Sequence, residues 1–157
     1  MTSNYKPVGG VKRVFLYPAE AIKRILFSSE GCEVEFASTD PIEVELMEDM
    51  SSYEERAEAT KGQTKIAHIL QLVADRAKGE AWLETDFLEM ASIDGVVAEV
   101  MLADNRRLLV GYSPTFGDEQ PLRLKSLSSS SGSTLHDRPT VTLRLESHDT
   151  AFSCEII

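Results

Sequence analysis

The sequence contains little cysteine and histidine, the residue types that most often build disulfide scaffolds and metal sites. Among its 157 residues there are two cysteines and three histidines. Cys32 and Cys154 form no CxxC motif, and no HxH, HExxH or Cys/His spacing joins the histidines. We interpret the cysteines as small buried side chains, His68 as a partly buried polar residue and His148 as a turn cap. We therefore predict no metal and no cofactor.

The motifs of common enzyme classes are also missing. There is no GxSxG nucleophile elbow, no GxGxxG dinucleotide motif and no Walker A lysine. Two glutamate pairs, Glu33/Glu35 and Glu43/Glu45, are the best candidates for paired-carboxylate chemistry, because residues two apart on a strand share a face, roughly 7 Å apart. They alternate with apolar residues, which favours solvated carboxylates on the polar face of amphipathic strands. We predict that the protein is not an enzyme.

Excess positive charge and long apolar runs are likewise lacking. The net charge is −10, the opposite of what a protein needs to bind DNA by neutralising its phosphates. No run approaches the roughly 18 apolar residues of a membrane span, and the first ten residues contain no apolar signal-peptide core. The sequence thus predicts synthesis in the cytoplasm, no export by a signal peptide and no membrane partner.

Alternation of apolar and polar residues with period two dominates what is present. It predicts strands over residues 11–17, 32–36, 42–46, 63–75, 122–125 and 140–147, with a final edge within 151–157. Residues 19–27 fit either one helical turn or a short strand. Residues 48–61 are polar, and we interpret them as an exposed loop or a long β-connection.

One segment, residues 76–94, has helical periodicity. Leu83, Phe87, Met90 and Ala91 form a single apolar stripe, and Gly95 follows as a C-terminal cap.

Directly afterwards, Asp104–Asn105 separates two apolar runs. This predicts a hairpin with a two-residue type I′ turn, in which Ala103 pairs with Arg106 and Met101 with Leu108.

These elements predict a mainly β fold: an antiparallel β-sandwich or rolled barrel of about seven or eight strands with one flanking α-helix. We expect one domain, 1–157, because no repeat or convincing linker divides the chain. Residues 1–8 and the serine-rich stretch 127–138 are expected to be flexible.

The order of several short motifs resembles small phage or prophage tail tube-like proteins, which are related in fold to the inner-tube protein of type VI secretion. The resemblance covers nearly the whole chain and is strongest from Trp82 onward. The motifs that carry it are Gly9–Val11, Tyr53–Glu55 before the strand 65–73, the helix Trp82–Met90 followed by Gly95–Ala98, Leu109–Tyr112, Phe116–Gly117, Pro121–Leu124, Ser131–Gly132 and Leu143–Thr150.

This resemblance implies a virion structural protein without catalysis, which self-assembles into hexameric rings whose inner wall is a continuous sheet. Its partners would be further copies of itself and other tail proteins, with DNA or a tape-measure protein only as passing cargo. It would assemble in the bacterial cytoplasm and end in the virion tail.

The resemblance also suggests roles for individual residues. Glu43 and Glu45 would face the lumen of the ring, where like charge would keep a polyanion from binding. The segment 51–62, with Tyr53, Glu54, Glu55 and Arg56, would reach a neighbouring subunit. Residues 48–64 are the candidate for the long hairpin that bridges adjacent rings, and residues 128–137 would become ordered on assembly.

A second function class stays open: a non-enzymatic β-sandwich module that recognises a peptide or a glycan. Tyr112 and Phe116 are close enough in sequence to form an aromatic binding patch, although they suit a core equally well.

Overall fold

A computed structural model describes residues 10–37, 41–47, 50–76, 84–113, 117, 119–131, 139–149 and 153–157. These residues form eleven β-strands and one α-helix, and all pairings within the sheets are antiparallel. The mainly β class with one helix is confirmed. The strand number exceeds the predicted seven or eight partly because the ambiguous segment after residue 19 and the polar segment before residue 61 both form strands.

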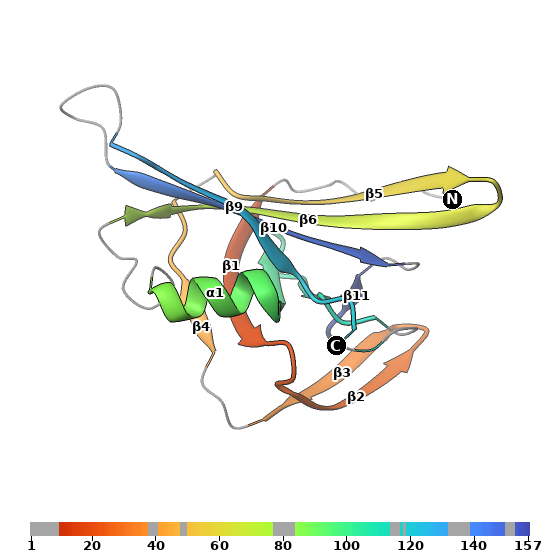
Figure 1. The fold of residues 1–157 in the computed structure, drawn as a ribbon. Helices are drawn as coiled ribbons and strands as arrows, with labels where there is room; N and C mark the ends of the chain where they lie inside the picture. Colours follow the sequence, from red (N-terminus) through yellow and green to blue (C-terminus); the bar gives the residue numbers. More distant parts are fainter. Residues whose placement is uncertain are drawn as a thin grey trace.

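The strands form two main sheets and a separate hairpin (Figure 1). The five-stranded sheet has the order β11 (Cys154–Glu155), β8 (Arg107–Val110), β7 (Val96–Leu102), β1 (Val11–Pro18), β4 (Ile42–Val44). The four-stranded sheet has the order β5 (Ser52–Thr60), β6 (Gln63–Asp75), β10 (Thr140–Asp149), β9 (Arg123–Ser130). The hairpin consists of β2 (Ile22–Ser28) and β3 (Gly31–Phe36), and the helix is α1 (Thr85–Ile93).

The main core lies between the two large sheets. In β10, Val141, Leu143 and Leu145 are buried while the residues between them are half-exposed, as period-two patterning predicts. Val14 and Val100 oppose them from the five-stranded sheet, and α1 closes the side of the core. Each fully buried valine or leucine stabilises the fold by about 1.5–3 kcal/mol, so this interface provides much of the driving force for folding.

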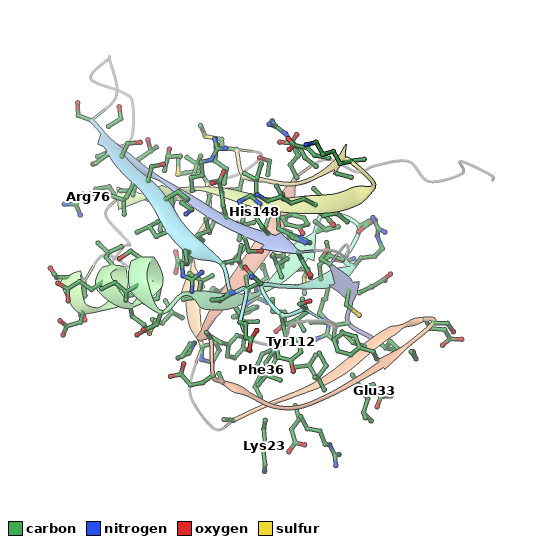
Figure 2. All side chains as sticks on the ribbon, turned by 45° about the vertical axis from the view of Figure 1, so that its right-hand side comes forward. Lys23, Glu33, Phe36, Arg76, Tyr112 and His148 are labelled. Atoms are coloured by element: carbon green, nitrogen blue, oxygen red, sulfur yellow. The ribbon has the colours of Figure 1, made fainter. Side chains whose placement is uncertain are left out.

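A second, smaller core lies on the opposite face of the five-stranded sheet. There, Cys32 of the β2–β3 hairpin packs with Val97 and Leu109 of the sheet, and all three are fully buried. The rings of Tyr17 and Phe36 stack with their centroids 3.8 Å apart. Figure 2 shows Phe36 pointing into the space between this hairpin and the sheet, whereas Lys23 and Glu33 point away from it. The five-stranded sheet is therefore covered by side chains on both faces.

The helix lies within the predicted range 76–94, and Gly95 ends it as expected. Gly95 has a φ of 85°, and its amide donates to the Met90 carbonyl oxygen at 2.9 Å. Phe87 and Ala91 of the predicted stripe are buried, whereas Leu83 and Trp82 lie outside the described residues.

The β7–β8 hairpin is present, but its predicted turn and register are wrong. Met101 pairs with Arg107 instead of Leu108, and residues 103–105 form a three-residue loop. Only Asn105 has a positive φ, 70°, whereas a type I′ turn needs two such residues. The Asp104 carboxylate accepts a hydrogen bond from the Arg106 amide at 3.1 Å and stabilises this longer turn.

The serine-rich stretch also differs from the prediction of a flexible loop. β9 continues through Ser130 and pairs with β10 from Arg123 onward. Leu127 lies opposite Leu143 and packs on the main core, so one inward leucine and backbone pairing hold serines in a strand. Residues 132–138 and 1–8 lie outside the described residues.

Candidate functional site

The four-stranded sheet carries a long hairpin whose tip extends past the adjacent strand. β5 and β6 pair continuously from Ser52–Gln71 to Thr60–Gln63. Lys61 and Gly62, with φ of 52° and 80°, form the two-residue turn between them. β10 pairs with β6 only from Ile66 onward, so the tip projects beyond the rest of the sheet (Figure 1). The segment expected to contain a long hairpin thus supplies one arm and the turn, and β6 supplies the other arm.

Both edges of this sheet are open within the described part of the chain. β5 pairs only with β6, and β9 pairs only with β10. An edge strand presents every second N–H and C=O group without a partner, which makes it a template for another strand. β5 and β9 are nine and eight residues long, so each edge offers several such groups. A register shift near Arg144 is the one irregularity in the β9–β10 pairing.

The solvent-exposed face of the sheet carries charges of both signs. Arg56 donates to Glu54 at 2.8 Å, and Arg144 donates to Glu146 at 2.8 Å. The hydrogen bond from Arg56 is the main cause that lowers the pKa of Glu54, and the charge of Arg144 adds a smaller effect in the same direction. Glu58 lies opposite Lys65 near the tip of the hairpin.

Hydroxyl groups occupy the β9 side of the same face. Ser126, Ser128 and Ser130 lie opposite Arg144, Thr142 and Thr140 in the register with β10. We call this surface, with Glu54, Arg56, Glu58, Lys65, Arg144 and Glu146, the polar face. Among these six there are three carboxylates and three cationic groups, so this face carries charges of both signs in spite of the net charge of −10.

The inner face of the hairpin holds a cluster of buried polar side chains. Tyr53 Oη lies 2.6 Å from Nδ1 of His68, and His68 is 3% exposed. Burial is the main cause that raises the pKa of Tyr53, and the nearby carboxylate of Glu55 adds to it. The phenol therefore stays protonated at neutral pH and is available as a hydrogen-bond donor.

Glu55 connects this cluster to the C-terminal segment. Its two carboxylate oxygens accept hydrogen bonds from the hydroxyl of Ser153 at 2.8 Å and from the Ser153 amide at 3.0 Å. Nearby, the Ser113 hydroxyl donates to Asp149 at 2.8 Å. The Glu55 contacts join β5 to the segment that leads into β11, and the Ser113 contact joins the residues after β8 to the end of β10. Both sets of contacts therefore anchor distant parts of the chain to each other.

The alternation along β5 divides the four residues expected to meet a neighbouring subunit. Tyr53 and Glu55 face the interior of their own subunit, where their polar atoms have intramolecular partners. Glu54 and Arg56 face outward on the polar face. Only the second pair therefore presents side chains to another molecule.

The candidate lumen residues lie in the other sheet. Glu43 is in β4, its side chain is 40% exposed, and it pairs with Arg13 at 2.9 Å. Glu45 is also exposed, just beyond the end of β4. Glu33 and Glu35 are exposed on β3, and Glu35 lies 3.7 Å from Lys23. The interpretation of both glutamate pairs as solvated carboxylates is confirmed.

The histidines take different positions. His68 is buried, whereas His148 lies within β10 instead of capping a turn. Burial, followed by the charge of Lys65, lowers the pKa of His148. His136 lies outside the described residues. Within the described ranges, no group of three or more His, Cys, Asp or Glu residues is arranged to hold a metal ion. No helix in the same ranges is long and apolar enough to span a membrane.

Of the two aromatic residues considered for a binding patch, Tyr112 packs against the second core. Its ring lies 6.2 Å from that of Phe27, centroid to centroid. Phe116 lies outside the described residues.

Sequence reasoning missed two features of the site: the pairing of the serine-rich β9 and the contact of Glu55 with Ser153.

No known family model, curated protein or solved structure matches the chain.

Proposed function

We propose that the protein is a phage tail tube-like structural subunit that assembles into rings by pairing the edges of its four-stranded sheet. The observation that carries this proposal is the pair of edges, β5 and β9, that stay open among the described strands of one extended sheet with a solvent-exposed face. The sequence resemblance to tail tube proteins supports the same function. Closing such sheets into one barrel would remove every open edge.

The strand directions suit a head-to-tail assembly. Three antiparallel steps separate β5 from β9, so the two edges run in opposite directions. A copy that is rotated about an axis parallel to the strands keeps its strand directions. Its β5 therefore lies antiparallel to β9 of the neighbouring copy. Such a heterologous contact makes a ring when the rotation closes.

The size of such a ring is compatible with cargo. Six copies, the number implied by the resemblance, would supply four strands each. At a strand spacing of about 4.8 Å, the wall would have a circumference of roughly 115 Å and a backbone diameter of roughly 37 Å, and strand tilt would widen it. This leaves room for an extended protein or a nucleic acid duplex.

In this arrangement the polar face lines the lumen. Its charges are of both signs, and Arg56–Glu54 and Arg144–Glu146 are paired locally. Together with the hydroxyl groups, these pairs would let a polyanion pass without strong attraction or repulsion. Glu54 and Glu146 therefore replace Glu43 and Glu45 as the proposed lumen carboxylates, because the latter two lie on the other sheet. The projecting β5–β6 tip is free to contact an adjacent ring.

The test combines sedimentation and negative-stain microscopy over a range of protein concentrations with proline variants of β9. Along an edge strand, alternate residues direct their N–H groups outward. Ser128 and Ser129 are neighbours, so one of them directs its N–H group outward and the other directs it toward β10. Proline at the outward position should keep the monomer folded and abolish ring formation. The matched control is alanine at the same position, which leaves the N–H group in place. A wild-type chain that stays monomeric at its solubility limit would contradict the proposal.

The runner-up, a peptide- or glycan-binding module, has weaker geometric support. The outer surface of the β2–β3 hairpin has a hollow of about 170 Å³, bordered by Arg24, Leu26 and Glu33. This volume is below the range of roughly 300–1,000 Å³ that is usual for ligand pockets.

A further inference from the structure

The β2–β3 hairpin has an open strand edge on the side of the molecule away from the four-stranded sheet (Figure 1). Among the described strands, β2 pairs only with β3. The pairing is regular from Arg24 to Ser28, and a register shift at Lys23 interrupts it. The regular part of this edge therefore has Leu26 at its centre.

The two-residue turn after Ser28 determines which backbone groups of β2 point outward. Residues that flank a two-residue turn form a hydrogen-bonded pair, so the backbone groups of Ser28 point toward Gly31. The direction alternates along a strand, so Ile25 and Phe27 direct their N–H and C=O groups away from β3. These outward groups lie symmetrically on the two sides of Leu26.

Large apolar side chains are exposed at the same edge. Leu26 is 57% exposed and Phe27 is 40% exposed. The ring of Phe27 lies near that of Tyr112, whereas Leu26 borders the hollow on the outer surface of the hairpin. An open edge with exposed apolar residues is a template for another strand.

Charges of opposite sign occupy the two ends of the hairpin. At the start of β2, the side chains of Lys23 and Arg24 are 69% and 73% exposed, and both lie 3.7 Å from the carboxylate of Glu35. At the other end, Glu30 in the turn and Glu33 are exposed. An antiparallel strand with the same charges would place its acidic turn beside the cationic start of β2. The edge is therefore complementary to itself under a two-fold rotation.

We propose that β2 of one copy of this chain pairs antiparallel with β2 of a second copy, about a two-fold axis at Leu26. The two hairpins join into one four-stranded sheet. Leu26 lies opposite Leu26 of the second copy, and Ile25 lies opposite Phe27. Each of the two Ile25–Phe27 pairs supplies two main-chain hydrogen bonds. The contact uses neither β5 nor β9, so it is independent of the ring proposal.

The length of the regular edge selects this register. It places Arg24 opposite Ser28 of the second copy and Lys23 beside the turn that carries Glu30. A shift by two residues in one direction would bring the irregular backbone at Lys23 into the ladder. A shift in the other direction would leave only Leu26 to Ser28 to pair, because the turn follows.

Disulfide trapping tests the contact in the full-length protein. Opposed residues of a non-hydrogen-bonded pair have Cα atoms about 4.5 Å apart, within the disulfide range of roughly 4.4–6.8 Å. Leu26→Cys should therefore give a covalent dimer on a non-reducing gel after mild air oxidation. The matched control is Arg24→Cys, whose two copies would lie roughly 13 Å apart along the strands. Both variants retain Cys32 and Cys154, so these thiols contribute equally.

A charge exchange in the Leu26→Cys background tests the two ends of the contact. Arg24→Glu alone and Glu30→Arg alone should each slow trapping by at least about tenfold, because like charges then meet twice across the two-fold axis. The two substitutions together should restore the rate. Circular dichroism should show an unchanged fold, because all three side chains are exposed.

Equal trapping of Leu26→Cys and Arg24→Cys would overturn the inference, since the thiols would then meet only by random collision. Charge variants that trap as fast as Leu26→Cys alone would contradict the two-fold register. Rings that form while Leu26→Cys gives no covalent dimer would remove this inference and leave the ring proposal intact.

Discussion

Gly95 and Gly62 have nearly the same φ, 85° and 80°, but different surroundings. A Cβ at Gly95 would lie 2.6 Å from Cγ of Pro121, whereas a Cβ at Gly62 would meet nothing within 4 Å. We expect Gly62→Ala to lower the free energy of unfolding by about 1 kcal/mol, the cost of a left-handed backbone conformation. Gly95→Ala should cost about 2–4 kcal/mol, because the clash adds to that backbone cost.

Urea unfolding followed by circular dichroism measures both changes. Because the backbone contribution is common to both variants, their difference isolates the steric effect at Gly95. Equal destabilisation would mean that Pro121 moves away without cost.

The titration of Tyr53 makes the free energy of unfolding depend on pH in the alkaline range. Its folded-state pKa is raised above the ordinary value of 10, so the folded protein keeps this proton where the unfolded chain has lost it. Stability from this group is present below pH 10 and is lost as the pH rises above 10. Tyr53→Phe should therefore reduce the loss of stability above pH 10, by at most about 1.4 kcal/mol per pH unit.

Denaturant unfolding of wild type and Tyr53→Phe at pH 8, 10 and 11 gives the two slopes. At pH 8 the variant should be less stable by about 1 kcal/mol, because it lacks the hydrogen bond with His68. Parallel pH profiles for the two proteins would show that Tyr53 titrates alike in both states.

At the scale of elements, β5 contributes to folding through its inner face and to the proposed lumen through its polar face. Glu55→Ala removes the acceptors of the Ser153 amide and hydroxyl, so we expect a loss of about 1–3 kcal/mol. Amide exchange of residues 153–157 should become faster. Glu54→Ala, one residue away on the polar face, should change stability by less than about 0.5 kcal/mol.

Hydrogen exchange with mass spectrometry, together with urea unfolding, distinguishes the two variants. Unchanged exchange of the C-terminal segment in Glu55→Ala would show that β8 and β3 alone hold it in place.

Strands with an apolar inner face could be predicted from the sequence, because burial imposes period two on them. Val141, Leu143 and Leu145 show this, and the prediction for residues 63–75 matches β6. Turns were less predictable. Asp104–Asn105 suggested a type I′ turn, yet that conformation is found at Lys61–Gly62, where lysine is an unusual residue for a positive φ.

The candidate site was only partly predictable for a related reason. Composition suggested a loop at the serines of β9, but pairing with β10 decides their conformation. Glu55 and Ser153 are 98 residues apart, and no local pattern connects residues at such a separation. The sequence could show that β5 carries polar residues, but only the register shows which of them face inward.

For the whole molecule, charge reversal tests which face lines the proposed lumen. Glu54→Lys with Glu146→Lys adds positive charge to the polar face, and Glu43→Lys with Glu45→Lys adds the same charge to the other sheet. We expect both double variants to fold and assemble, because all four side chains are at least partly exposed. Rings of the first should bind duplex DNA inside the lumen, and rings of the second should bind it outside.

Nuclease protection of bound DNA distinguishes the two locations. DNA should be protected by rings of Glu54→Lys/Glu146→Lys and digested when bound to rings of Glu43→Lys/Glu45→Lys. The reverse pattern would mean that the sheet containing β4, and not the polar face, lines the lumen.

The strand order also has a consequence for the timing of synthesis. The β5–β6 hairpin is local, so it can form while the rest of the chain is still on the ribosome. β9 pairs only with β10 among the described strands, and β10 lies between β9 and β6 in the sheet although it follows β9 in the chain. β9 can therefore join the sheet only after β10 has been synthesised. A nascent chain presents the β5 edge first and gains the β9 edge later, so the two edges of the proposed head-to-tail contact are not available at the same time during synthesis.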